Sequence, residues 1–270
     1  MGKFFKTHLP FTRAAMQSAA TYRLDFLAHA FGHLLAAFIA FSLWRVAFNE
    51  QEIMEGFTIH TMVFYLFLSF STTLVTNTWS GWSLSEEIRD GRIAMRLIRP
   101  SNFSFELFFL ELGDKMMGNF PFFVLTLLGL EAYHLVIFGL LQFNLVYFLL
   151  HLVSLLLAML LNFFFVMCFG YLAFVLKYIW GLNMLRLALV GVLSGTLIPL
   201  VFFPEWAQTV LQILPFSSMI FTPVMLYLGM FDFWQTITAL ALQVGWLAFF
   251  WALSVLIWKL STKKLTIQGG

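Results

Sequence analysis

The side chains that could act together chemically are concentrated in one stretch of this 270-residue chain. Residues 83–100 hold seven of its 15 basic and 13 acidic side chains, between apolar segments long enough to cross a membrane. The seven are Glu86, Glu87, Arg89, Asp90, Arg92, Arg96 and Arg99. Inserting such a charge into hydrocarbon costs roughly 2.5–3.5 kcal/mol. We therefore expect this stretch to lie in the cytoplasm and to form a docking surface.

Helix signals divide this charged stretch in two. Ser83 and Glu86 have the spacing of a capping box, which predicts a short helix beginning near Ser83 or Ser85. Gly91 is placed to end that helix, because glycine adopts the left-handed conformation of a helix terminus without strain. The first half is therefore expected to be an acidic helix.

A second helix is predicted over residues 92–99, and Pro100 stops it. Its three arginines, at positions 92, 96 and 99, would share one face. A loop whose arginines bind lipid phosphates is the alternative interpretation. That loop would bring its acidic residues against anionic lipid, so protein docking is favoured.

Other residues suggest metal or catalytic chemistry less strongly. His29 and His33 stand four apart and could share a helical face as ligands of a metal or haem. An intramembrane hydrolase would need a nucleophile beside a base, or paired acids at one depth. Ser83 lacks the flanking glycine of a nucleophile motif, and Asp114 with Lys115 is interpreted as an interfacial ion pair. We expect no catalytic residue, cofactor or metal in this chain.

Composition places the chain in the membrane. Apolar residues make up 61% of it, charged residues 10%, and the mean hydropathy is +0.90. Soluble domains have about 45–50% apolar and about 25% charged residues. Cys168 is the single cysteine, which excludes a disulfide framework within one chain. We expect an all-α integral membrane protein with no cleavable signal peptide.

Hydropathy predicts six spans of a membrane about 30 Å thick. They are Asp25–Phe48, Phe57–Trp82, Lys115–Ile137, Gln142–Leu176, Gly181–Phe202 and Phe233–Trp258. Residues 1–24 are expected to form an amphipathic helix on the membrane surface, or else a basic leader that sets topology. No separate soluble domain is expected, so residues 1–270 are predicted to be a single transmembrane domain.

Lysine and arginine placement predicts the orientation. Basic residues fall in the N-terminal segment, after the second and fourth predicted spans and in the tail, whereas the alternate loops carry acidic residues alone. Lys177 and Arg186 are assigned to the loop after the fourth span. Two exceptions, Arg45 and Lys115, are expected to snorkel to an interface. Both termini are therefore predicted to be cytoplasmic.

The segment 199–230 is unusual on the predicted outer side. It contains Pro199, Pro204, Pro215 and Pro223, four of the chain's seven prolines, and each removes a backbone donor. Broken helices at membrane depth need protein or water to satisfy the freed groups. We predict a short interfacial helix with Trp206, Val210 and Leu214 on one face, followed by a re-entrant piece. An ordinary loop is the alternative.

Two sets of small polar residues lie within predicted spans. The second span carries Ser69, Ser71, Thr72, Thr73, Thr76 and Asn77, and the fifth carries Ser194, Gly195 and Thr196. They could line a polar cavity, or they could let helices pack closely. Both interpretations remain open from the sequence.

These features together resemble the type 2 ABC exporter permeases, and the resemblance extends over essentially the whole chain. The matching residues are Glu86–Gly91, Arg99–Pro100, Ser194–Gly195, Ile198–Leu200, Phe203–Trp206 and Leu214–Phe216. Asn162 with Phe169–Phe174 resembles the fourth span of the branch often described as multidrug or antibiotic permeases.

The resemblance implies roles for each region. Residues 1–24 would be the connecting helix, and residues 83–100 would hold the coupling helix that binds an ATPase. The implied coupling residues are Glu86, Glu87, Arg89, Asp90, Gly91 and Arg92. The implied translocation path contains Ser69, Thr72, Thr73, Thr76, Asn77, Ser194 and Thr196. The implied outer gate in segment 199–230 contains Pro199, Phe203, Pro204, Trp206, Pro215 and Phe216.

The resemblance also implies partners. The chain has no GxxxxGK[ST] phosphate loop, so ATP and Mg²⁺ would bind to two copies of a separate ATP-binding cassette subunit. A second permease, either the same chain or a paralogue, would complete the machine in a prokaryotic plasma membrane, with membrane lipid around it and no nucleic acid. The implied cargo is a hydrophobic or amphipathic drug, antibiotic or peptide. Export of a lipid or lipid-linked glycan, or sensing without transport, are the alternatives.

Overall fold

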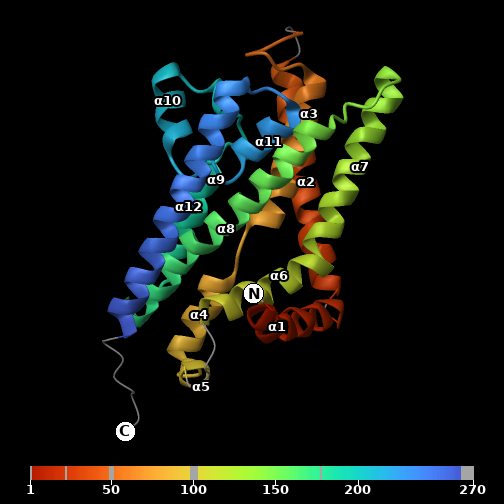
Figure 1. The fold of residues 1–270 in the computed structure, drawn as a ribbon. Coiled ribbons are helices and arrows are strands. Elements are labelled where there is room, and N and C mark those ends of the chain that lie inside the picture. The colour runs from red at the N-terminus through yellow and green to blue at the C-terminus, as the bar shows by residue number, and fades with distance from the viewer. Residues whose placement is uncertain (1, 22, 49–51, 98–102, 177, 263–270) are drawn as a thin grey trace.

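The computed structural model describes residues 2–21, 23–48, 52–97, 103–176 and 178–262 (Figure 1). Within these ranges the chain is helical and has no strand beyond one isolated bridge between Met54 and Phe57. Five of the described helical segments are long and apolar enough to cross a membrane. The prediction of an all-α membrane protein is confirmed.

Most of the predicted spans correspond to a helix. The first, fourth and sixth become α2 (Arg23–Ala47), α8 (Leu145–Leu176) and α12 (Phe233–Thr262). The third span begins later than predicted, as α7 (Asn119–Phe138). A separate helix, α6 (Phe103–Met117), precedes it and was not predicted.

The fifth predicted span is shorter than expected. It contains α9 (Trp180–Leu193), whose 14 residues extend about 21 Å, well short of the hydrocarbon thickness. The chain turns at Gly195, where φ is +81°, and then forms the 3-10 helix η1 (Leu200–Phe202). Six full spans are therefore not confirmed, because the turn interrupts an apolar run that hydropathy alone treats as continuous.

The second predicted span is interrupted as well. Helix α3 (Ile59–Thr76) ends where Asn77 adopts an extended ψ of 144°, and α4 (Ser80–Arg89) begins three residues later. The Asn77 side chain accepts a hydrogen bond from the Thr78 backbone N–H at 3.0 Å. This local bond offers the backbone an alternative to continued helix.

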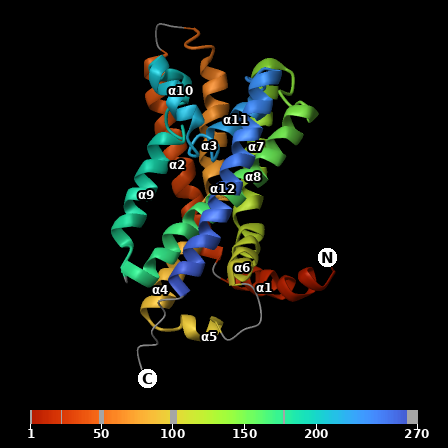
Figure 2. The ribbon, with the colours of Figure 1, turned by 60° about the vertical axis from the view of Figure 1, so that its left-hand side comes forward.

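Two helices lie across the end of the bundle at which the N-terminus is found (Figures 1 and 2). Helix α1 (Gly2–Thr21) packs against α6, and Thr12 Oγ1 donates a hydrogen bond to the Phe109 carbonyl at 3.0 Å. The predicted surface helix therefore exists as a helix, and Pro10 lies inside it.

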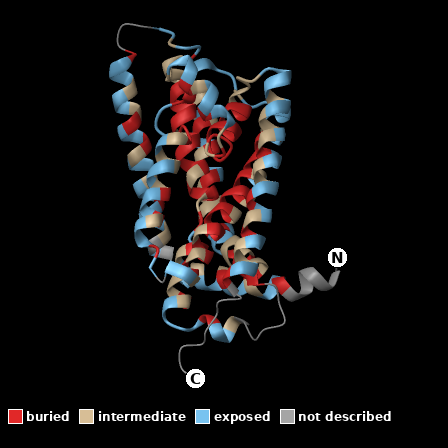
Figure 3. Cartoon of the chain, turned by 90° about the vertical axis from the view of Figure 1, so that its left-hand side faces the viewer, coloured by how far each residue is buried: buried red, intermediate tan, exposed pale blue. Residues whose placement is uncertain are grey.

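The core is built around α3, α8 and α11 (Phe221–Leu228), with buried residues concentrated in the centre of the bundle (Figure 3). Thirteen of the 18 residues of α3 are buried. Helices α2, α7 and α12 instead expose long apolar faces. In a membrane protein such faces contact lipid or a second membrane subunit.

The two ends of the molecule differ in character. Helices α1, α4 and α5 (Ile93–Leu97) gather at one end with the final turns of α12 (Figure 1). Helix α10 (Glu205–Ile213) and residues 52–58 lie at the other end. The densely charged stretch and the proline-rich segment are thus on opposite ends.

Candidate functional site

The charged stretch folds as a helical hairpin of α4 and α5, which we call the charged hairpin (residues 80–97). Gly91 lies at its turn with φ +74°, so the prediction that a helix ends there is confirmed. The predicted capping box is wrong: α4 begins at Ser80, and its N-cap Trp79 makes no side-chain capping bond. The hydroxyls of Thr78 and Ser80 donate to the Glu111 carboxylate and so secure the start of α4.

The acidic residues of α4 are engaged within the protein. Glu87 is 8% exposed and forms an ion pair with Arg96 at 2.7 Å. Glu86 accepts a hydrogen bond from Trp82 Nε1 at 3.1 Å. Glu87 therefore joins α4 to α5, whereas the Glu86 bond lies within α4, and both carboxylates offer less to a partner than the sequence suggested.

The tip of the charged hairpin is open to solvent. The side chains of Arg89, Asp90 and Arg92 are 51%, 41% and 63% exposed, and Asp90 lies 3.3 Å from Arg89 and 3.0 Å from Arg92. Hydrogen bonds from Arg92 and then Arg89 lower the pKa of Asp90. This tip presents both signs of charge in a small area.

The predicted arginine face of the second helix is not formed as expected. Arg92 contacts Asp90 at the tip, whereas Arg96 turns inward to Glu87 and lies 3.9 Å from Glu106. Arg99 and Pro100 lie outside the described residues. Helical spacing gave the wrong prediction here because the buried carboxylate of Glu87 attracts Arg96.

Helix α4 is packed tightly against α8. A Cβ atom on Gly81 would lie 2.6 Å from Val166 Cγ1 and 2.8 Å from the Val166 carbonyl oxygen. A Cβ on Gly170 would lie 2.9 Å from the Cα of Gly81. The two helix backbones therefore touch, and such contacts require small residues.

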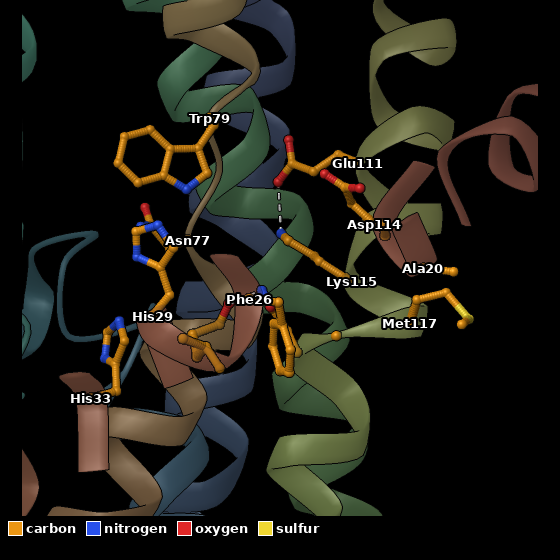
Figure 4. Close-up of a pocket in the computed structure, with 14 residues that line it drawn as sticks. Ala20, Phe26, His29, His33, Asn77, Trp79, Glu111, Asp114, Lys115 and Met117 are labelled. Carbon is orange, nitrogen blue, oxygen red and sulfur yellow. Dashed lines mark hydrogen bonds and ion pairs between the residues drawn. The ribbon is translucent and has the colours of Figure 1, made fainter. Parts of the chain in front are cut away.

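Glu111 on α6 forms the centre of a polar cluster beside the break between α3 and α4 (Figure 4). Besides accepting from Thr78 and Ser80, it pairs with Lys115 at 2.7 Å. Lys115 is 4% exposed, so the predictions that it snorkels and that Asp114 is its partner are wrong. Burial, followed by repulsion from Glu111, raises the pKa of Asp114.

A cavity of about 530 Å³ lies next to this cluster. We call it the inner cavity; its lining includes His29, His33, Asn77, Trp79 and Asp114 (Figure 4). Within the part of the chain that the structure describes, no group of three or more His, Cys, Asp or Glu residues could hold a metal ion.

A second, smaller space of about 220 Å³ lies between α3, α8, α9 and the turn after α9. We call it the polar pocket. Four of the seven predicted path residues line it, namely Thr73, Thr76, Asn77 and Thr196. The other three, Ser69, Thr72 and Ser194, are buried and do not line it. Asn77 lines both the polar pocket and the inner cavity.

Comparison with known proteins assigns the family. The model of the ABC-2 family transporter proteins matches residues 34–269. This chain belongs to the ABC-2 transporter family. No curated protein matches the sequence. The chain is therefore a type 2 ABC permease, a multi-pass membrane component of a transporter that works with an ABC ATPase.

One polar pocket residue of this ABC-2 permease was misassigned from the sequence. Arg186 was placed in a loop after the fourth span, but it lies in α9, lines the polar pocket and is 4% exposed. The signal was an arginine inside an apolar run, which in membrane proteins marks a functional position by default. Asn162 on α8 also lines the pocket and donates through Nδ2 to the Thr76 carbonyl at 2.8 Å.

Segment 199–230 of the permease contains the short helices η1, α10 and α11. Pro199 and Pro204 precede η1 and α10, and Gln208 Nε2 donates to the Val201 and Phe203 carbonyls at 2.8 and 2.7 Å. Trp206 is 75% exposed on α10. The short predicted helix is thus present, and its apolar face points outward.

The chain then turns inward beyond α10. Pro215 is buried, and Phe216 packs edge-on against Phe165 of α8 with ring centres 6.0 Å apart. Helix α11 follows, buried between α3 and α8, and it contains Pro223. The predicted gate residues therefore differ in exposure: Pro204 and Trp206 are exposed, Phe203 and Phe216 are half-buried, and Pro199 and Pro215 are buried.

Proposed function

We propose that this chain is the membrane-spanning permease subunit of an ATP-driven exporter. It pairs with a second permease, the same chain or a paralogue, and two separate cassette subunits bind ATP and Mg²⁺. The dimer lies in the plasma membrane of a prokaryote with both termini in the cytoplasm. By alternating access it moves a hydrophobic or amphipathic compound, such as a drug, antibiotic or peptide, out of the cell.

The observation that carries this proposal is the position of Asn77. It lines both the inner cavity and the polar pocket, and it lies three residues before α4. Helix α4 in turn packs backbone to backbone on α8. A movement of the charged hairpin therefore reaches both spaces through the joint at residues 77–79.

Coupling requires an element that binds the cassette differently in its two states. The charged hairpin suits this role as the coupling helix. Arg89, Asp90 and Arg92 at its exposed tip make the contact, and Gly91 shapes the turn. Glu87 joins α4 to α5 through Arg96, and Glu86 fixes Trp82 within α4. The segment 199–230 acts as the outer gate at the opposite end, because closing a path there requires movable helix ends.

A pulldown from native membranes tests the coupling assignment. The tagged wild-type chain is expected to retain a stoichiometric soluble ATPase that bears a phosphate loop. The Arg89→Glu/Arg92→Glu variant should lose at least about tenfold of that partner, because reversed charges at an interface cost several kcal/mol. The matched Arg89→Lys/Arg92→Lys variant keeps the charge and should retain it.

Two results would contradict this assignment. If the charge-reversed variant retained as much ATPase as wild type, the tip would not be part of the interface. A purified wild-type chain with no ATPase would contradict the coupled exporter itself. Efflux that depends on the cargo, measured in reconstituted vesicles, separates transport from sensing.

A further inference from the structure

Helix α9 has its polar side chains facing inward. The structure buries two of its 14 residues, Asn183 and Arg186, which stand one turn apart on the same face. Its large apolar residues, including Leu185, Leu189 and Val192, are exposed. Figure 2 shows the helix at the side of the bundle. Ionisable residues at membrane depth face an interior or cavity and mark substrate or ion pathways.

The inward donors of α9 have no partner within the described residues. Arg186 Nε and Asn183 Nδ2 are buried without a hydrogen-bond acceptor. No described carboxylate lies within 4 Å of Arg186. Glu111 attracts Arg186 from a greater distance, but that carboxylate is engaged by Lys115, Thr78 and Ser80. A buried cation without an acceptor is costly, which indicates that something absent from this chain supplies one.

The rest of the polar pocket supplies uncharged polar side chains and apolar walls. None of its described lining residues carries a carboxylate. The hydroxyls of Thr73 and Thr76 donate to carbonyls of their own helix, so Arg186 is the principal donor left for a ligand in the pocket. Leu187, Val190 and Met219 form part of an apolar wall beside Arg186.

The size of the polar pocket limits its occupant. Its volume of about 220 Å³ is below the roughly 300–1,000 Å³ of sites that enclose whole drug-sized ligands. The space suits a compact head group, while the remainder of a longer molecule would continue along apolar surface.

We propose that the polar pocket binds the anionic head group, a phosphate or carboxylate, of an amphiphile. Arg186 is the residue that binds the anion, and the apolar wall receives the start of the chain. This inference rests on the proposed function and narrows its cargo to anionic amphiphiles. Cationic compounds are excluded, because the pocket would place their charge beside an arginine that no carboxylate neutralises.

Equilibrium binding to the full chain tests this assignment. The protein is placed in nanodiscs of zwitterionic phosphatidylcholine, and labelled dodecyl phosphate is the probe. Unlabelled dodecyl phosphate should compete, whereas dodecyltrimethylammonium should not. Inorganic phosphate separates the two sources of anion: weak competition supports an amphiphile, and competition equal to that of dodecyl phosphate would overturn the apolar part of the proposal.

Three arginine variants make the test specific. Arg186→Gln should weaken dodecyl phosphate binding about 10- to 100-fold, the range expected for losing hydrogen bonds to a charged group. Arg186→Lys keeps the charge and should recover part of that loss. Arg45→Gln removes an exposed arginine on α2 and should bind like wild type. Equal binding by Arg186→Gln and wild type would overturn the proposal.

Thermal unfolding gives a second, independent readout. Without ligand, Arg186→Gln should be at least as stable as wild type, because it removes an unpaired buried cation. A marked loss of stability would show that Arg186 has a structural partner, including one on a second permease, and would overturn the proposal. Neither binding nor unfolding requires the ATPase. If the pulldown retains the ATPase but dodecyl phosphate does not bind, only this inference is refuted. If dodecyl phosphate binds but the pulldown retains no ATPase, only the exporter proposal is refuted.

Discussion

The ion pair between Glu111 and Lys115 gives a quantitative test of the polar cluster beside α4. Glu111→Gln removes the negative charge but retains an oxygen that can accept from Thr78 and Ser80. The variant therefore isolates the loss of charge from the loss of hydrogen bonding. Lys115 is left with its side chain 5% exposed and its principal counter-ion absent.

The burial of this pair sets the expected magnitude. Breaking a buried ion pair by removing one partner costs about 3–5 kcal/mol, whereas an exposed pair contributes about 0–1 kcal/mol. Asp114 also attracts Lys115, so a loss near 3 kcal/mol is expected. The double variant Glu111→Gln/Lys115→Met removes both charges and should return to within about 1 kcal/mol of wild type.

The free energy of unfolding is measured by titrating the purified chain in mixed micelles with SDS and following tryptophan fluorescence. Asp90→Asn, which removes an exposed partner of Arg92, is the matched control and should change stability far less. A loss of under about 1 kcal/mol in Glu111→Gln would refute the reasoning. So would a double variant less stable than the single one.

Four further predictions concern the packing of α4, the orientation in the membrane, the polar cluster around Glu111 and the segment 199–230. Gly81→Ala should weaken coupling between ATPase activity and efflux, because its Cβ would lie 2.6 Å from Val166 Cγ1; Gly129→Ala meets nothing within 4 Å and should behave like wild type. In vesicles, a cysteine-reactive membrane-impermeant reagent should label Ile53→Cys from outside and Asp90→Cys from inside, because residues 52–58 and the charged hairpin lie at opposite ends of the molecule; the reverse pattern would contradict the proposed orientation. The raised pKa of Asp114 means that the folded chain holds its proton more readily than the unfolded chain, so stability falls as the pH rises through that pKa. Asp114→Asn should therefore be more stable than wild type at neutral pH, and the difference should vanish well below the ordinary value of 3.8; a pH-independent difference in thermal unfolding would contradict this. Pro215→Ala should reduce export more than expression, and equal loss of both would instead assign Pro215 a purely structural role.

Much of this protein could be predicted from properties that lie along the chain. The apolar composition required a membrane protein, because 61% apolar residues cannot be covered by a soluble surface. Helices α2, α8 and α12 followed from length and hydropathy. Gly91 was predictable as a helix end, because the backbone preference of glycine is local.

The joint at residues 77–79 and the polar pocket could not be predicted from the sequence, because they depend on contacts between residues that are distant along the chain. The start of α4 is held because Glu111, some 30 residues later, accepts hydrogen bonds from the hydroxyls of Thr78 and Ser80. Glu87 became an internal residue because Arg96 folds back upon it. Among the predicted path residues, the structure separated Thr73, Thr76, Asn77 and Thr196, which face the pocket, from those that only pack.

Arg186 shows where sequence reasoning stops. The sequence placed an arginine near the start of an apolar run, and a charge there is compatible with a loop or with a buried site. The positive-inside pattern favoured the loop, since it counts charges without regard to what surrounds them. Hydropathy measures how each residue partitions between water and lipid. Whether a polar side chain has an internal partner depends on helices brought together from distant parts of the chain, and only the tertiary structure decides that.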